Sequence, residues 1–416
     1  MNLKPFTLLI KPASADCNLR CPYCFYLDRA ALYPGSSVHR MSDEVLTALV
    51  EGYLQTPQPQ HVFGWQGGEP LLMGFDFFRQ AVDLQQKLGL PGSVVANGLQ
   101  TNGTLITPDL SRLFADYRFL LGVSLDGPEP IHDHYRRNAD GAGTYDRVRR
   151  GIDCLQRHEV SFNILTLVTS HPARRAEEIY RFHCAQGYRF QQYIPCVEYG
   201  MDGKAVPWTV GERDWGRFLC DLFDAWYPQD VRRISIRLFD SILARLVDDA
   251  ISVCHFGTDC RQYFVVEHNG DIYPCDFFVE ADWRLGNLQT DSWAELQASP
   301  LYRKFGEQKA CWNSRCATCR WVGICAGDCL KHRLCGGQVA EGVSRLCGGW
   351  QMFYEHTAER FERLAEEIRG ARRSGQAPAI RPDGRSPGRN ELCVCGSGRK
   401  FKHCCGRTKP AESNLA

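Results

Sequence analysis

The chain has 416 residues, enough for one large catalytic core and smaller appended modules. Its formal net charge of +1 excludes a global field that would hold nucleic acid or an anionic membrane, so we expect neither as a partner. No export signal or long apolar run is recognisable, which predicts a cytoplasmic protein. A count of 21 cysteines in a reducing compartment indicates metal ligation rather than disulfides.

Short β-rich runs alternate with helical segments from Phe6 to about Glu198. The expected strands are Phe6–Lys11, His61–Trp65, Leu99–Thr101, Leu120–Leu125, Phe162–Val168 and Phe190–Pro195. Apolar spacing of three and four predicts helices at Asp43–Leu54, Phe75–Leu88, Tyr145–His158 and Arg174–Gln186. Ser42 and Thr144 are expected N-caps. These units predict an α/β fold whose parallel sheet curls into a partial (β/α)6 barrel, with its chemistry at the carboxyl ends of the strands.

We place this barrel at residues 1–235, with a helical linker region around Trp215–Asp249. A second domain, residues 236–373, contains the loop-rich segment Cys254–Cys347 and a charged closing helix, Gln351–Arg373. So many cysteines in a loop-rich segment indicate that metal ligation, more than apolar burial, holds this domain together. Residues 374–387 are predicted to be a flexible linker, and residues 388–410 form a small basic module.

Three cysteines follow the first predicted strand with C-x₃-C-x₂-C spacing: Cys17, Cys21 and Cys24. Three thiolates can hold a [4Fe–4S] cluster and leave one iron open for a small molecule. No fourth cysteine occurs before Cys154. A zinc site that uses these three cysteines and a remote ligand is the alternative.

This spacing, with Tyr23 and Phe25 around Cys24, resembles the signature of radical S-adenosylmethionine (SAM) enzymes. In that family the open iron chelates SAM, which is cleaved to a 5′-deoxyadenosyl radical. Gly67-Gly68-Glu69-Pro70 resembles the family's GGEP motif. A simple glycine turn before Pro70 is the alternative. The resemblance implies that SAM is bound by Tyr23, Gly68, Ser124, Arg136 and Val197. An Asp126 cap and a surface ion pair for Arg136 are the structural alternatives.

Longer motifs narrow the resemblance to the anaerobic sulfatase-maturating enzymes. These motifs are Trp65–Pro70, Gln100–Thr104, Ser124–Pro128 and Ile131–Asp133, and the similarity extends over most of residues 1 to 370. Members of this family convert a Cys or Ser of a sulfatase into Cα-formylglycine. The resemblance does not say which of the two residues this chain accepts.

The cysteine-dense region resembles the SPASM domain of the same family, and its eight matched thiols suffice for two [4Fe–4S] clusters. The resemblance assigns one auxiliary cluster to Cys254, Cys260, Cys275 and Cys329, and the other to Cys316, Cys319, Cys325 and Cys347. Structural zinc at these sites is the alternative. Outside the pattern, Cys311 and Cys335 are expected to be ordinary thiols, and buried core positions are expected for Cys154, Cys184, Cys196 and Cys220.

The resemblance further implies that Asp276, directly after Cys275, is the catalytic base that takes the thiol or hydroxyl proton of the target residue. An auxiliary cluster would accept the remaining electron. Gln66 and Gln100 lie at strand ends and are candidates for binding the substrate backbone, with exposed loop residues as the alternative.

The C-terminal module resembles the SEC-C zinc-binding motif. Its C-x-C-x₈-C-C spacing supplies Cys393, Cys395, Cys404 and Cys405 as zinc ligands, and His403 could replace one of them. The expected cofactors are therefore three [4Fe–4S] clusters, SAM and zinc.

The expected partners are an unfolded or nascent sulfatase polypeptide and an electron donor such as flavodoxin or ferredoxin. A radical SAM maturase that crosslinks a ribosomal peptide is the nearest alternative enzyme. A non-catalytic zinc scaffold is the alternative from another class.

Overall fold

The computed structural model describes residues 3–27, 29–200, 202–333 and 342–374. Cys335 and the predicted zinc ligands of the C-terminal module lie outside these residues. The strands form one sheet in the order β10-β9-β8-β1-β2-β3-β4-β5-β6-β7. Their bounds are β1 Thr7–Lys11, β2 Gln60–Trp65, β3 Val94–Thr101, β4 Leu120–Ser124, β5 Ser161–Val168, β6 Phe190–Pro195, β7 Ser235–Ile236, β8 Tyr263–Glu267, β9 Asp271–Tyr273 and β10 Gly286–Asn287.

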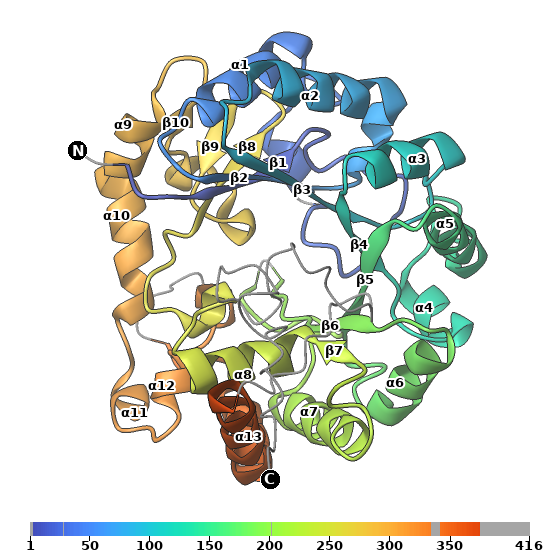
Figure 1. Ribbon diagram of the computed structural model, residues 1–416, viewed down its shortest axis with the longest axis vertical. Coiled ribbons are helices and arrows are strands. Elements are labelled where there is room, and N and C mark those ends of the chain that lie inside the picture. The colour runs from blue at the N-terminus through green and yellow to red at the C-terminus, as the bar shows by residue number, and fades with distance from the viewer. Residues whose placement is uncertain (1–2, 28, 201, 334–341, 375–416) are drawn as a thin grey trace, which may run out of the picture. The chain divides into compact units, whose positions relative to one another are not determined.

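The strands from β1 to β7 pair in parallel, and helices α1 to α6 follow one another around their outer side (Figure 1). This confirms the predicted α/β fold. The helices are α1 Asp43–Leu54, α2 Gly74–Leu88, α3 Pro108–Asp116, α4 Glu129–Tyr135, α5 Tyr145–Arg157, α6 Ala176–Ala185, α7 Glu212–Trp226, α8 Arg237–Asp248, α9 Trp293–Ala298, α10 Pro300–Glu307, α11 Ser314–Ala317, α12 Val322–Cys325 and α13 Cys347–Arg373.

The two predicted N-caps have different outcomes. The Ser42 hydroxyl accepts from Val45 N at 3.3 Å and begins α1 at the predicted residue. Thr144 holds the predicted N-cap position of α5, but its side chain makes no capping hydrogen bond there. Its hydroxyl donates instead to the Arg136 carbonyl oxygen at 2.8 Å, which fixes the loop between α4 and α5.

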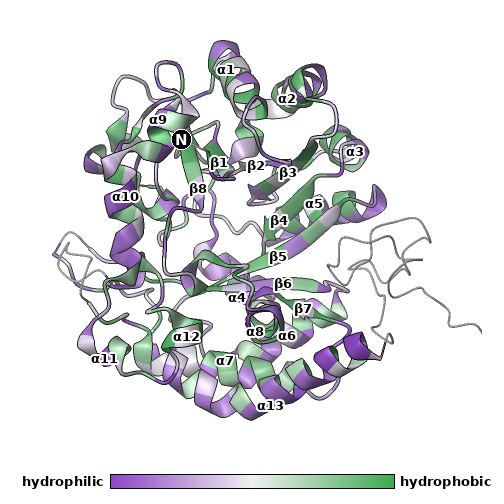
Figure 2. Ribbon diagram, turned by 60° about the vertical axis from the view of Figure 1, so that its left-hand side comes forward, coloured by the Kyte–Doolittle hydropathy of each residue, from purple (hydrophilic) through white to green (hydrophobic). Residues whose placement is uncertain are grey.

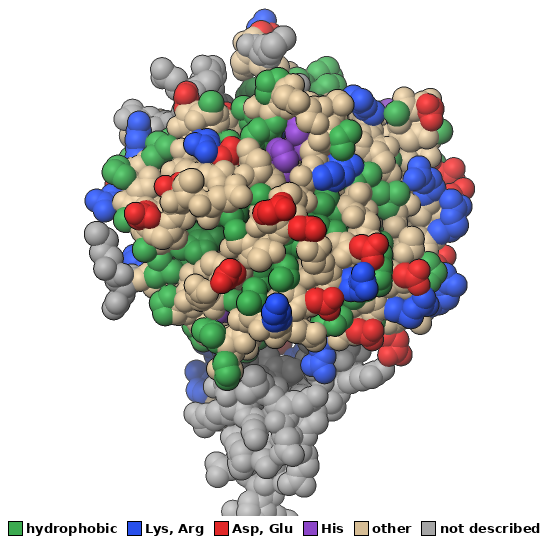
Figure 3. Space-filling model, turned by 90° about the horizontal axis from the view of Figure 1, so that it is seen from above, with side chains coloured by type: hydrophobic (Ala, Val, Ile, Leu, Met, Phe, Trp, Pro, Cys, Tyr) green, Lys and Arg blue, Asp and Glu red, His purple; other side chains and the backbone are tan. Residues whose placement is uncertain are grey.

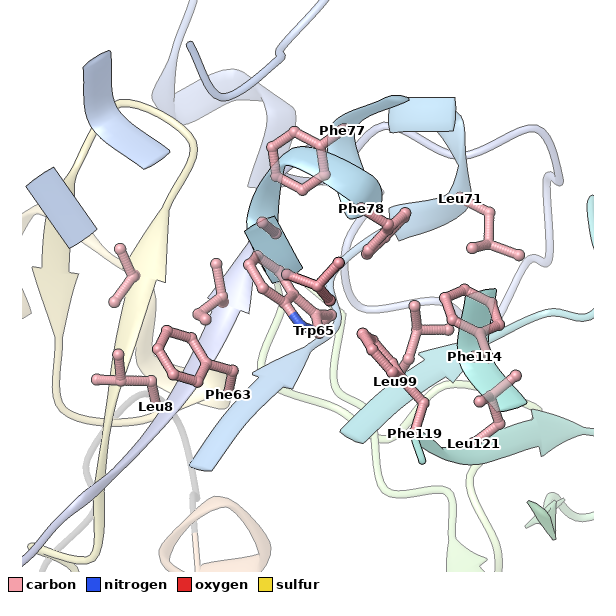
Figure 4. Packing of buried hydrophobic residues seen from close by; sticks show 14 of the residues in the cluster. Leu8, Phe63, Trp65, Leu71, Phe77, Phe78, Leu99, Phe114, Phe119 and Leu121 are labelled. Atoms are coloured by element: carbon pink, nitrogen blue, oxygen red, sulfur yellow. The ribbon is translucent and has the colours of Figure 1, made fainter. Parts of the chain in front are cut away.

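Aromatic and aliphatic side chains fill the space between the sheet and its outer helices (Figure 4). Trp65 on β2 is fully buried, and its ring meets Phe77 and Phe78 of α2 edge to face, with ring centroids 5.7 and 5.8 Å apart. Figure 2 shows the apolar colour concentrated on the inner strands, while the helices carry both apolar and polar residues. Burial of these strands and of one face of each helix holds the barrel together.

Strands from the cysteine-dense region extend the barrel sheet. Strand β8 pairs in parallel with β1, which places Glu267 beside Lys11, and β9 and β10 continue antiparallel. The loop-rich segment thus also contains short strands within Tyr263–Tyr273, which the sequence did not predict. As a result, Asp276 follows β9 by three residues and reaches the barrel.

A second compact unit comprises Leu238–Ser252 and the part of α13 from Glu355. Within it the rings of Phe239 and Phe361 lie 5.8 Å apart. No described helix has the length and apolar character needed to cross a membrane. Figure 3 shows acidic and basic side chains interspersed over one face of the molecule, as the balanced net charge predicts.

Candidate active site

The loop after β1 carries the first three cysteines. The backbone closes around them: Cys24 N donates to Cys21 O at 3.0 Å, and Leu19 N donates to Cys17 Sγ at 3.4 Å. Burial raises the pKa of Cys17 to about 12 and that of Cys24 to about 11, and the charges of neighbouring cysteines contribute to both rises. The thiols thus lie near one another in a buried loop, where iron would replace their protons.

Gly68 packs directly against the backbone of this cysteine loop. Gly68 N donates to Ser14 O at 2.8 Å, and Glu69 N donates to Asp16 O at 2.7 Å. A Cβ atom at Gly68 would lie only 2.0 Å from Asp16 O. The simple glycine turn is therefore an incomplete explanation, because the close approach of another backbone requires this glycine.

We predict that Gly68→Ala loses the iron of the first cluster, because the added Cβ must displace the cysteine loop. Iron and sulfide assays after anaerobic reconstitution measure this loss. Gly98→Ala is the matched control, since its Cβ would lie 3.8 Å from its nearest neighbour, Leu120 O. Full iron content and normal SAM cleavage in Gly68→Ala would contradict the prediction.

Glu69 is fully buried and organises the ends of β2 and β3. Its carboxylate accepts from Leu71 N at 3.0 Å, Thr101 Oγ1 at 2.8 Å and Asn102 N at 2.7 Å. Burial raises its pKa to about 7, while these donors favour the ionised form. Glu69 thus ties the glycine segment to the neighbouring strand end.

Arg136 forms a buried ion pair with Asp126. Its Nε and Nη2 atoms donate to the two carboxylate oxygens at 2.8 and 3.1 Å. Tyr23 OH donates to the same carboxylate at 3.3 Å, and Leu167 N does so at 2.9 Å. The surface ion pair considered for Arg136 is wrong, because both side chains are buried. Arg136 keeps further N–H donors for a ligand.

The remaining candidates for binding SAM and substrate also lie at strand ends. Gln100 Nε2 donates to Ser124 Oγ at 3.3 Å, so β3 and β4 bring these side chains together. Val197 is buried just after β6, beside Glu198, which pairs with Lys331. Gln66 and Gln100 are half-buried, so the alternative of exposed loop residues is wrong for both.

Asp276 is buried within a hydrogen-bonded and charged group. Tyr26 OH donates to Asp276 Oδ2, and Gln66 Nε2 donates to the same oxygen at 3.1 Å. Lys11 Nζ lies 3.5 Å from Asp276 Oδ1 and 2.9 Å from Glu267 Oε1. Burial and the Asp276 charge raise the pKa of Tyr26 well above its usual range, so the phenol stays a donor. Asp276 is thereby linked to the loop that carries Cys24.

Sequence reasoning missed Lys11, Tyr26 and Glu267. A lysine at the end of an otherwise buried strand was the available signal, because a buried cation needs a carboxylate partner. Tyr26 lies two residues after Cys24 and gave no comparable signal. The pairing of β8 with β1 supplies Glu267 and could not be read from the sequence.

The two auxiliary cysteine sets are each gathered in space. The charges of Cys254 and Cys329 both act on Cys275, and that of Cys254 acts on Cys260. The other set lines one small cavity with Trp350 and Tyr354, and its members are Cys316, Cys319, Cys325 and Cys347. Among the described residues, no three His, Cys, Asp or Glu side chains stand ready to hold a metal ion. Each set is therefore recognised by the closeness of its cysteines to one another, and its thiols would have to move to hold a metal.

The other described cysteines differ in exposure. Cys154 and Cys196 are buried as expected, and Cys311 is exposed. Cys184 and Cys220 are only partly buried, so their expected core position is wrong. None of these five forms a disulfide.

Known proteins match this chain in several regions. The Radical SAM superfamily matches residues 12–183, the iron–sulfur cluster-binding SPASM domain matches residues 254–320, and the SEC-C motif matches residues 389–407. A "Serine-type anaerobic sulfatase-maturating enzyme" of Bacteroides thetaiotaomicron is 34% identical, with 90% of this chain and 94% of that protein covered. A "Cysteine-type anaerobic sulfatase-maturating enzyme" of Clostridium perfringens is 35% identical, with 88% and 100% covered. The chain belongs to the anaerobic sulfatase-maturating enzymes.

A solved structure agrees with this membership. The structure described as native anSMEcpe with bound AdoMet and Cp18Cys peptide superposes with a TM-score of 0.82 at 35% identity, covering 88% of this chain and 100% of that one. Streptococcus suis SuiB, at 18% identity and a TM-score of 0.59, shows a similar fold only. As a member of the family, this chain is a radical SAM enzyme that generates formylglycine. It uses iron–sulfur clusters and SAM and acts on a sulfatase.

Proposed function

We propose that the chain oxidises the active-site Cys or Ser of a sulfatase to Cα-formylglycine with Asp276 as its catalytic base. The observation that carries this proposal is the buried Asp276 carboxylate, which Tyr26 and Gln66 join to the loop of the first cysteines. An oriented carboxylate at this position can accept the proton of a thiol or hydroxyl group. General base catalysis of this kind contributes roughly two to four powers of ten in rate.

The donor set supports three clusters. The first would bind Cys17, Cys21 and Cys24 and leave an iron for SAM, and the two auxiliary sets would each supply four thiolates. When bound, the first cluster and SAM would supply the removal of a hydrogen atom from Cβ of the target residue, and an auxiliary cluster would accept the remaining electron. The described cysteines of these sets are all outside disulfides, which suits iron in a reducing compartment.

SAM would lie between the first cysteine loop and the strand ends. Tyr23 is fixed by Asp126, and Arg136 has donors left for a carboxylate. Gly68, Ser124 and Val197 complete the proposed contacts. Their common position at the carboxyl ends of strands or in the following loops supports this assignment.

Gln66 and Gln100 would bind the substrate backbone. Each side-chain amide already contacts one functional neighbour, Asp276 for Gln66 and Ser124 for Gln100. Amide groups both donate and accept hydrogen bonds, so each can hold a peptide group as well. The target residue would thus lie between the proposed SAM site and the base.

We further propose an unfolded or nascent sulfatase as the partner, flavodoxin or ferredoxin as the electron donor, and a cytoplasmic location. A reducing location keeps so many thiols available for iron. Zinc in the C-terminal module, held by Cys393, Cys395, Cys404 and Cys405, is supported by the match to the SEC-C motif. The domain boundaries given above stay predictions.

The decisive experiment is mass spectrometry of a sulfatase-type peptide, in Cys and Ser versions, after anaerobic incubation with reconstituted enzyme, SAM and a reductant. Formylglycine with matching deoxyadenosine is the expected result, and it identifies the accepted residue. Deoxyadenosine release with both peptides unchanged would overturn the proposed substrate and leave the SAM chemistry in place.

Removal of the residues after Pro387 is expected to spare turnover of a short peptide. The proposed catalytic residues all lie at or before Cys347. Peptide turnover of the truncated and full chains, compared at equal iron content, measures this. Loss of turnover in the truncated chain would show that the C-terminal module takes part in catalysis.

A further inference from the structure

The segment Cys325–Cys329 connects the two proposed auxiliary cluster sites. Cys325 belongs to one ligand set and Cys329 to the other. The three residues between them, Ala326, Gly327 and Asp328, all have positive φ, at 46°, 73° and 62°. Such a backbone is unfavourable for Ala and Asp, so its surroundings must hold it in place.

Two buried cations hold this segment. Lys309 is fully buried, and its Nζ donates to Ala326 O at 2.8 Å, to Asp328 O, and to His255 O at 3.2 Å. His255 directly follows Cys254. Lys309 therefore binds the carbonyl group next to Cys325 of one ligand set. It also binds the carbonyl groups next to Cys254 and Cys329 of the other set.

Arg333 reinforces these contacts from the other side. It is almost fully buried, and its Nε donates to Gly327 O at 2.6 Å, its Nη2 to Ala326 O at 2.8 Å, and its Nη1 to Lys309 O at 3.1 Å. The carbonyl oxygens of all three positive-φ residues are thus bound by one or both cations.

These hydrogen bonds end on neutral carbonyl groups, and neither cation forms an ion pair within the described residues, although the Asp328 charge acts on Lys309. The carboxylate of Asp328 is occupied by His332 Nδ1 at 2.9 Å and Ser344 Oγ at 2.6 Å. Buried charges are costly unless an opposite charge lies close by. Iron–sulfur clusters with four thiolate ligands carry net negative charge and would provide it on both sides.

The charge of Lys309 reaches sulfur atoms of both sets. Burial raises the pKa of Cys260 and of Cys325 to about 12 each, and the Lys309 charge opposes both rises. Arg333 acts on Cys260 in the same direction. Lys309 therefore acts electrostatically on both sites, and Arg333 acts on the site to which Cys260 belongs.

We propose that Lys309 and Arg333 form a cationic bridge that fixes the connection between the auxiliary clusters and raises the reduction potentials of both. Reduction adds a negative charge to a cluster, and a fixed positive charge nearby favours the reduced state. Both clusters thereby become better acceptors for the electron left by substrate oxidation. The inference rests on the proposed ligand sets.

The test is Lys309→Met in a background where Cys17, Cys21 and Cys24 are replaced by Ala, so that only auxiliary clusters remain. Redox titration followed by electron paramagnetic resonance measures both potentials. We expect each reduction equilibrium to weaken at least tenfold, which is about 59 mV for a one-electron couple. Lys304→Met, at an exposed position of α10, is the matched control and should change neither potential.

Unchanged potentials at full iron content in Lys309→Met would overturn the bridge. If Lys309→Met loses iron, Lys309→Arg decides: retained clusters support the need for charge, and equal loss shows that side-chain shape alone matters and overturns the proposal. Iron for fewer than two clusters in the parent background would instead disprove the ligand sets, and with them the proposed cofactors.

Discussion

Asp276→Asn is expected to lower formylglycine formation by about two to four powers of ten while the iron content stays unchanged. Asparagine preserves the shape of the side chain and can still accept from Gln66 Nε2, which lies 3.1 Å from Asp276 Oδ2, but it cannot take a proton. Substrate deprotonation would therefore fail in an otherwise assembled site. Single-turnover assays with quantified peptide product and deoxyadenosine measure the loss.

Asp282→Asn is the matched control, because Asp282 is an exposed acid six residues further along the chain. It should turn over at the normal rate. Full activity of Asp276→Asn with normal cluster content would show that another group is the base. Equal losses in both variants would point to a general effect of removing acidic charge.

Lys11→Met is expected to destabilise the barrel by about 3–5 kcal/mol and to abolish turnover, because it leaves two buried carboxylates without their shared cation. Lys11 is fully buried and lies between Glu267 and Asp276. Its Nζ also lies 4.7 Å from the centre of the Tyr26 ring, so the variant also weakens the support of this phenol. Urea denaturation gives the change in the free energy of unfolding.

The pH dependence of this stability should weaken in the variant. Burial raises the pKa of Glu267, but the charge and hydrogen bond of Lys11, together with hydrogen bonds from His268 and Ser14, lower the value from 4.5 to about 2. In the wild type this stabilisation is present above about pH 4.5 and is lost as the pH falls toward 2. In Lys11→Met the lowering by Lys11 is lost while the hydrogen bonds of His268 and Ser14 remain, so less stability should be lost as the pH falls from 4.5 toward 2.

Two comparisons make the Lys11 prediction specific. Lys4→Met, at an exposed position before β1, should leave stability unchanged. Adding Glu267→Gln to Lys11→Met should recover part of the lost stability, because it removes one uncompensated charge. Additive losses in the double variant would show that Lys11 acts through packing alone.

The sequence predicted the barrel elements well where apolar spacing alone decides them. Helix α1 begins and ends at the predicted residues, because a capping serine and a regular apolar face agree there. Strand β3 begins five residues earlier than expected. Its polar Asn97 accepts from Trp65 Nε1 at 2.9 Å and exchanges hydrogen bonds with Gln85, and such long-range contacts leave no local pattern.

The candidate site was predictable where a motif is local. The three cysteines form a short motif, and the resemblance that they begin assigned Gly68 and Asp276 from residues close by in the sequence. Lys11 and Glu267 meet only through the parallel pairing of β1 with β8, more than 250 residues apart. No spacing within the sequence encodes such a pair. The only local signal was a lysine at the end of an otherwise buried strand.

The pairing of β1 with β8 also determines how long one edge of the first strand stays unpaired during synthesis. Ribosomes add roughly 5–20 residues per second, so Thr7–Lys11 would wait tens of seconds for Tyr263–Glu267 to be made. Until then the first strand is the open edge of an incomplete sheet, and its lysine lacks the Glu267 carboxylate. The growing chain is therefore most prone to misassembly through this strand edge before its cysteine-rich segment emerges.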